Sequence, residues 1–151
     1  MERIWIYQAA KSFSEGEEAR ILNKLEAFTD QWKAHKEKLT ARVEIRYHLF
    51  IIISVDLSQV LPSGCSIDKS VHLLKELESE LNISLFDRMQ IAYREGDEIQ
   101  VVPRATFEQL LATGQINEDT MVFNNLVDNG EDLKTKWEVP FKDSWHARVF
   151  A

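Results

Sequence analysis

The sequence contains few of the residues that interrupt or cross-link a fold, with 1 cysteine, 3 prolines and 5 glycines among 151 residues. Because Cys65 is the sole cysteine, an intrachain disulfide and a four-thiolate zinc site are both excluded within one chain. Long disordered linkers are typically richer in proline and glycine than this chain is. The composition therefore predicts a chain that folds over most of its length without covalent cross-links.

Long hydrophobic runs and an excess of positive charge are also missing. The longest apolar run, Leu49 to Ile53, is far shorter than the roughly 20 residues of a membrane-spanning helix. The first residues lack the charged-then-apolar pattern of a secretion signal, so the expected location is the cytoplasm. With 18 basic and 25 acidic residues and a net charge of −7, neither nucleic acid nor an anionic membrane surface is the expected partner.

Known cofactor and metal motifs are absent from the sequence. Gly-Lys occurs nowhere, which excludes the Walker A phosphate loop, and there is no GxGxxG fingerprint of a dinucleotide site. His35, His48 and His72 are scattered, and no HExxH or HxH pair occurs. The sequence therefore predicts no metal, no cofactor and no ATPase activity.

Hydrophobic periodicity predicts a single α+β domain over residues 1–151, a length typical of one domain. The order is strand, helix, strand, strand, helix, strand, strand up to about residue 102. Its first six elements match the ferredoxin-like βαββαβ arrangement, an antiparallel sheet with two helices on one face. A different α+β sandwich is the alternative. The core is then about 1–102, and an appended helix, short strand and aromatic tail occupy about 103–151.

Element boundaries follow from local signals in the sequence. Ser14 begins a capping box and predicts a helix over about 15–35. Strict alternation predicts a strand over 41–47, and a β-branched run predicts a buried strand over 49–57. A second helix is expected over about 66–81, and Gly96 predicts the turn of a hairpin between 89–93 and 99–102.

Cys65 is the first candidate catalytic residue because it lies just before the second predicted helix. A helix N-terminus carries partial positive charge, which lowers a thiol pKa and stabilises an oxyanion. His146 is the candidate base, and Asp143 or Asp87 is the candidate group that orients it. The alternative is that Cys65 is a small packed residue with no chemical role.

Six further residues are candidates for ligand binding, and each has a structural alternative. Asp87 and Arg88 form either a fixed ion pair or a site for a carboxylate or phosphate. The asparagine-rich stretch near 124–130 suits a turn as well as a ligand. The tail residues from Lys142 to Arg148 either meet an anionic ligand or anchor the tail through an indole. The six candidates are Arg46, Asp87, Arg88, Asn124, Trp145 and Arg148.

Seven stretches of the sequence are distinctive when taken together: Arg3–Gln8, Glu44–Tyr47, Ser63–Asp68, Phe86–Arg88, Gly96–Glu98, Val122–Leu126 and Lys142–His146. Together they resemble a family of short, uncharacterised bacterial proteins often labelled "ABC transporter ATPase", and the resemblance covers nearly the whole chain. An ABC ATPase needs a phosphate loop, which this sequence lacks, so the label does not describe the expected mechanism. The segment 107–123 also resembles a GYF-type small binding module.

Three functions remain open from the sequence. The leading hypothesis is a non-enzymatic intracellular binding or interaction domain, because Trp5, Trp137 and Trp145 suit a binding surface and no catalytic spacing occurs. The second is a thiol-dependent enzyme that uses Cys65 with His146. The third is a small-anion or metabolite binder that uses Arg46, Arg88 and Arg148. The expected partner is a protein or a small anionic ligand, and the chain is a monomer or a homodimer.

Overall fold

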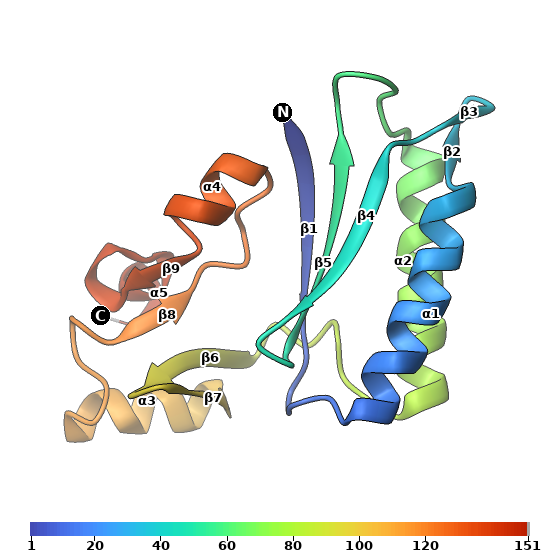
Figure 1. Ribbon diagram of the computed structural model, residues 1–151. Helices are drawn as coiled ribbons and strands as arrows, with labels where there is room; N and C mark the ends of the chain where they lie inside the picture. Colours follow the sequence, from blue (N-terminus) through green and yellow to red (C-terminus); the bar gives the residue numbers. More distant parts are fainter. Residues whose placement is uncertain (151) are drawn as a thin grey trace.

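The computed structural model describes residues 1–150, which form antiparallel sheets with helices packed around them (Figure 1). This confirms the α+β class. None of the helices in residues 1–150 combines the length and apolar character required to cross a bilayer. The strands are β1 (Glu2–Gln8), β2 (Lys33–Ala34), β3 (Glu37–Lys38), β4 (Ala41–Arg46), β5 (Phe50–Asp56), β6 (Gln90–Glu95), β7 (Glu98–Pro103), β8 (Met121–Phe123) and β9 (Glu138–Pro140). The helices are α1 (Glu15–Gln31), α2 (Gly64–Leu81), α3 (Arg104–Thr113), α4 (Gly130–Thr135) and α5 (Trp145–Phe150), with a short 3-10 helix η1 (Phe141–Asp143).

The first sheet has the strand order β1-β5-β4, and α1 and α2 lie side by side on one of its faces (Figure 1). Its central strand β5 is buried on both faces, as the β-branched run predicts. Ile51, Ile53 and Val55 face the helices and pack with Leu25 and Leu74 in one hydrophobic cluster. This cluster holds both long helices against the sheet.

Both long helices begin at side-chain caps. Ser14 accepts a hydrogen bond from the Glu17 amide while the Glu17 side chain accepts one from the Ser14 amide, so the predicted capping box is formed. The first helix ends at Gln31 rather than near residue 35. The next residues form the β2–β3 hairpin, whose His35 and Lys36 have positive φ angles of 51° and 70° and cannot continue a helix.

The second sheet has the order β7-β6-β8-β9 and lies over the other face of the first sheet. Phe50 and Ile52 of β5 pack there with Phe123 and Trp137 in a second hydrophobic cluster. On its far side, α3, η1 and α5 supply a third cluster that is centred on Phe107. The C-terminal third of the chain therefore packs on the sheet face that α1 and α2 leave open.

The ferredoxin-like arrangement predicted from the sequence is not confirmed by the strand order. Such a sheet has its last strand beside its first, which would place β6 next to β1. Instead β6 pairs with β7 and β8 in the second sheet. Ile91, Ala92 and Tyr93 are all buried, so β6 needs cover on both faces, and the second sheet provides it through the second and third clusters. The place beside β1 holds no strand within residues 1–150.

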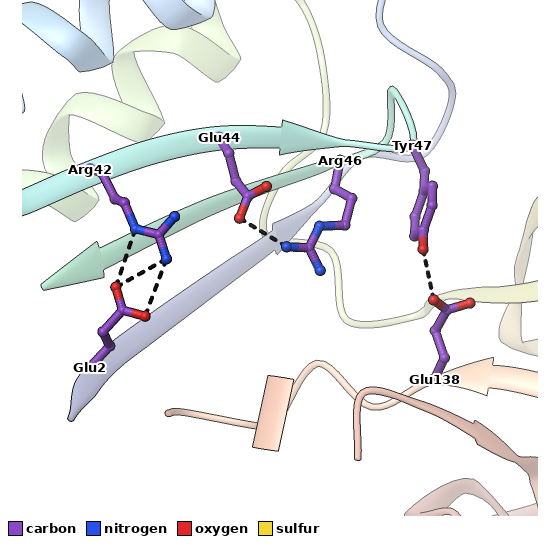
Figure 2. Close-up of polar contacts among 6 residues, drawn as sticks. All are labelled: Glu2, Arg42, Glu44, Arg46, Tyr47 and Glu138. Atoms are coloured by element: carbon purple, nitrogen blue, oxygen red, sulfur yellow. Dashed lines mark hydrogen bonds and ion pairs between the residues drawn. The ribbon is translucent and has the colours of Figure 1, made fainter. Parts of the chain in front are cut away.

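The turn between β4 and β5 links the first sheet to the rest of the molecule. Tyr47 and His48 both have positive φ angles, of 56° and 57°. Figure 2 shows the Tyr47 hydroxyl pointing at Glu138 of β9, to which it donates a hydrogen bond of 2.8 Å. His48 lies 2.6 Å from the Glu18 carboxylate of α1. This hairpin turn thus contacts both the helical layer and the second sheet.

Candidate functional site

A cavity of about 680 Å³ lies along β1 where a fourth strand of the first sheet is missing. This volume falls in the range of small-ligand sites, roughly 300–1,000 Å³. One wall is β1 itself, and the opposite walls come from the loop after α2, the turn after β8 and the start of α5. The main lining segments are residues 3–8, 85–88, 90–92, 125–128 and 145–146.

Three residues that line this cavity each carry a buried side-chain nitrogen that has no hydrogen-bond partner within residues 1–150. The three nitrogens are Arg3 Nε, Trp145 Nε1 and His146 Nδ1, and they are the buried side-chain polar atoms of the described chain that lack a partner. Buried polar groups in folded proteins nearly always have partners, because an unpaired donor costs about 1–3 kcal/mol. Their presence in residues that line one cavity marks it as the candidate functional site.

His146 is a neutral side chain in this site. Its ring is 3% exposed and stacks on the Trp145 indole at a centroid distance of 3.9 Å. Burial lowers its pKa to about 4, from an ordinary value of 6.5. At neutral pH the imidazole is therefore uncharged, and its Nδ1 donates or accepts according to the tautomer.

The positive charge of the cavity comes from Arg3 and Arg88. Neither makes an ion pair within residues 1–150, whereas most arginines of the chain do. The Arg3 guanidinium lies over the Trp5 ring, 5.0 Å from its centroid. The carboxylate of Asp87, also on the wall, accepts from the Met89 amide at 2.9 Å and from the Gln90 side chain at 3.5 Å. Asp128, the second acid of the wall, accepts from the Asn129 side chain at 3.2 Å. Both acids are engaged locally, and both guanidiniums are left for a ligand.

Hydrogen bonds between distant parts of the chain close one end of the cavity. Gln8 donates from Nε2 to the Gln90 carbonyl at 3.0 Å and accepts from Asn125 Nδ2 at 2.8 Å. Asn125 in turn accepts from the Trp137 indole at 2.9 Å. These bonds hold the loop after β8 against the end of β1, and they give the cavity a fixed outline.

The structure brings together four of the residues singled out in the sequence. Asp87, Arg88, Trp145 and His146 all line the cavity, from the loop after α2 and from α5. The tail is helical from Trp145 onward rather than extended, so Trp145 and His146 adjoin along the first turn of α5. The site therefore joins two segments that are about sixty positions apart in the sequence.

Cys65 lies elsewhere, away from His146. It is the second residue of α2 and is exposed, and it lines a separate cavity with His35, Lys36 and Lys69. The two cavities share no lining residue, and the Cys65 thiol makes no hydrogen bond to a histidine within residues 1–150. The predicted pairing of Cys65 with His146 is therefore not present in this structure.

The remaining predicted residues lie outside both cavities. Arg46 pairs with Glu44 at 3.0 Å, as Figure 2 shows, and stacks over the Trp137 ring at 5.4 Å. Asn124 forms a turn by accepting from the Leu126 amide at 3.2 Å. Asp143 and Arg148 are exposed on η1 and α5. Of the three arginines expected to converge, Arg88 alone reaches the candidate site.

Sequence reasoning missed Arg3, Gln8 and Asn125 as residues of the site. Arg3 directly precedes the apolar and aromatic run Ile4–Tyr7 of β1, which was the one available signal. Gln8 and Asn125 are joined only through the tertiary fold, so no local pattern identifies them.

Comparisons of the chain with protein-family models, with curated proteins and with solved structures find no match. Within residues 1–150 no group of three or more histidine, cysteine, aspartate or glutamate side chains is placed to hold a metal ion.

Proposed function

We propose that this protein is a binding domain whose ligand occupies the cavity along β1 and presents a carboxylate or carbonyl oxygens to its wall. The observation that carries the proposal is that three residues lining one cavity each carry a buried polar atom without a partner within residues 1–150. Arg3 and Trp145 have N–H donors, and the neutral His146 has a third group that donates in one tautomer. A ligand rich in oxygen acceptors suits this set of groups.

Two arginines of the site without ion pairs in the described chain suit an anionic ligand. Arg3 and Arg88 are free of ion pairs within residues 1–150, although the chain as a whole carries a net charge of −7. A guanidinium presents a planar set of donors that matches a carboxylate. Asp87 and Asp128 also line the cavity, so its formal charges balance, and the site suits one small anionic group held by a guanidinium better than a polyanion such as nucleic acid.

A nuclear magnetic resonance titration with small carboxylates tests the proposal. The side-chain N–H resonances of Arg3 and Trp145 are followed while acetate, succinate or N-acetylglycine is added. We expect both resonances to shift in a saturable way. The Trp32 indole is the internal control, because it already donates to the Ser66 carbonyl at 2.8 Å. If Trp145 and Trp32 shift alike, or neither shifts, the proposal is wrong.

Matched arginine variants show which guanidiniums contribute to carboxylate binding. Arg3→Gln and Arg88→Gln remove a cation from the cavity wall, whereas Arg148→Gln removes one from an exposed position outside it. We expect the cavity variants to weaken carboxylate binding by about tenfold each, as for a charge-assisted hydrogen bond, and Arg148→Gln to leave it unchanged. Equal losses in all three variants would indicate a general charge effect.

Two finer features belong to the same proposal. We propose that the N-terminal lobe is an incomplete ferredoxin-like sheet, because its order β1-β5-β4 is that of the first three strands of that arrangement. We also keep the cytoplasm as the proposed location, since the single exposed thiol of Cys65 fits a reducing compartment. The thiol-dependent enzyme is the less favoured function, because Cys65 and His146 line different cavities.

A further inference from the structure

The outer edge of β1 exposes backbone hydrogen-bonding groups to the cavity. On the inner side, Leu57 donates to the Met1 carbonyl at 2.9 Å, and Ala9 donates to the Leu49 carbonyl at 2.8 Å. Both are odd-numbered positions of this segment, and backbone groups alternate in direction along a strand, so the odd residues face β5. Even-numbered residues of β1 therefore direct their N–H and C=O groups outward.

This outward edge is paired at one end only. Ile4 donates to the Asp128 carbonyl at 2.8 Å, and Arg3 forms an isolated bridge with Asn129. Beyond that contact, no strand within residues 1–150 flanks β1 on this side. The Ile6 N–H and C=O and the Gln8 N–H therefore point into the cavity without a backbone partner, and Figure 1 shows this edge of β1 turned toward the second sheet.

The outer edge of β1 and the cavity wall opposite it together define which kind of ligand fits between them. The edge offers alternating N–H and C=O groups at a spacing of about 3.3 Å per residue, and it is long enough for about four residues of an added strand. Arg3 at the start of β1 supplies a guanidinium beside this edge. The wall facing the edge carries Trp145 and apolar side chains such as Phe86 and Leu126, the latter 69% exposed. A small anion satisfies the Arg3 and Trp145 donors but leaves the strand edge unpaired, whereas an extended peptide satisfies both.

Two other occupants fit the edge less well. The chain's own β6 is already paired on both sides, with β7 and β8. A second copy pairing edge to edge would need β1 at the surface, but residues 85–88 and 125–128 flank it as cavity walls. A single extended segment is narrow enough to enter where a folded sheet is not.

We propose that the ligand of this domain is an extended peptide that adds to the outer edge of β1 as a further strand and places a carboxylate at Arg3. The inference rests on the proposed function, because it names the class of ligand for the same cavity. Main-chain hydrogen bonds to Ile6 and Gln8 supply sequence-independent affinity, and the carboxylate at Arg3 sets the register. The carboxylate is either an acidic side chain or the C-terminus of the peptide.

The probe is a library of N-acetylated random heptapeptides in two sets, one with a free C-terminal carboxylate and one amidated. Peptides retained by the immobilised full chain are identified and resynthesised singly. Selection of the free-carboxylate set alone identifies a C-terminal carboxylate, and selection of acidic peptides from both sets identifies a side chain. Either result supports the proposal, and retention of no peptide, or of peptides without any carboxylate, overturns it.

Amide hydrogen exchange then tests strand addition in the unmodified protein. We expect a selected peptide to slow exchange at the Ile6 and Gln8 amides by about tenfold or more, because these amides gain partners. The Trp5 and Tyr7 amides face β5 and are protected with or without peptide. N-methylation of alternate peptide amides should abolish the effect. Binding without slower exchange at Ile6 overturns the inference.

A pair of variants isolates the backbone contribution. Gln8→Pro removes the outward N–H, which an edge strand tolerates on its open side, and Gln8→Ala keeps that N–H while losing the same side chain. We expect Gln8→Pro to bind a selected peptide about tenfold more weakly than Gln8→Ala. If acetate shifts the Trp145 indole but no peptide protects Ile6, this inference fails and the binding function stands. If neither occurs, both fail.

Discussion

Asn125 donates a hydrogen bond from Nδ2 to Gln8 Oε1 at 2.8 Å, joining two residues that are 117 positions apart in the chain. The same Asn125 accepts from the Trp137 indole at 2.9 Å through its other amide atom. One amide thus connects the end of β1, the loop after β8 and the start of the segment that leads to β9. It holds the two sheets together at the closed end of the cavity.

Replacing Asn125 should destabilise the fold. Asn125→Ala leaves Gln8 Oε1 and the buried Trp137 N–H without partners, and we expect the free energy of unfolding to fall by about 2 kcal/mol. Asn124→Ala is the control, because Asn124 loses only an exposed turn contact to Leu126. Chemical denaturation followed by tryptophan fluorescence measures both. Equal losses in the two variants would show that Asn125 acts only as a turn residue.

His146 should make the protein less stable in acid. The unfolded chain protonates this imidazole below about pH 6.5, whereas burial holds the folded pKa at about 4. Between these values the unfolded state binds more protons, so the free energy of unfolding falls as pH is lowered. The difference between the two pKa values corresponds to about 3 kcal/mol of unfolding free energy. All of this stabilisation is lost once the pH falls below the folded pKa.

Comparison of variants separates His146 from the other titrating groups. His146→Gln should have a shallower dependence of unfolding free energy on pH between 6.5 and about 4 than the unmodified protein. His72→Gln, at an exposed position on α2, should keep the full slope. If His146→Gln retains the slope of the parent, the acid sensitivity originates elsewhere.

Ser14 should contribute to stability through its cap alone. Ser14→Ala removes the acceptor for the Glu17 amide at the start of α1, at a cost of about 1 kcal/mol. Ser12→Ala, two residues earlier and outside the helix, is the matched control and should change stability little. Thermal unfolding of the two variants side by side gives the difference. A larger loss for Ser12→Ala would contradict the assignment of Ser14 as the cap.

Cys65 should react with iodoacetamide in the native protein, because its thiol is exposed. His146→Gln should leave the alkylation rate unchanged, since His146 lines a different cavity. Alkylation should also leave the carboxylate-induced shift of the Trp145 indole intact. Mass spectrometry of timed samples measures the alkylation rate. A lower rate in His146→Gln would instead support the thiol-dependent enzyme.

Much of the local structure is predictable from the sequence. The capping box at Ser14, the buried run of β5 and the turn at Gly96 depend on neighbours within a few positions, and each predicted element appears near its expected place. The exception is the end of α1, which lies at Gln31 and not near residue 35. The backbone at His35 and Lys36 takes positive φ angles, which no pattern of side chains predicts.

The candidate site was only half visible in the sequence. Asp87, Arg88, Trp145 and His146 stood out by residue type, and the cavity contains all four. The sequence does not show that these four residues share one cavity. It instead suggests a pair of Cys65 with His146, which line different cavities. Residue type indicates which side chains suit a site, but it does not indicate which of them meet.

The α+β class, the two long helices, the strands they alternate with and the absence of disulfides follow from periodicity, caps and composition, whereas the β2–β3 hairpin, α4, β9 and α5 do not. The pairing of β6 with β8 instead of β1 is visible only in the tertiary structure. That choice depends on which faces of β6 find apolar cover, a balance between contacts distant in sequence. The same choice leaves the edge of β1 open and thereby creates the cavity that carries the proposed function.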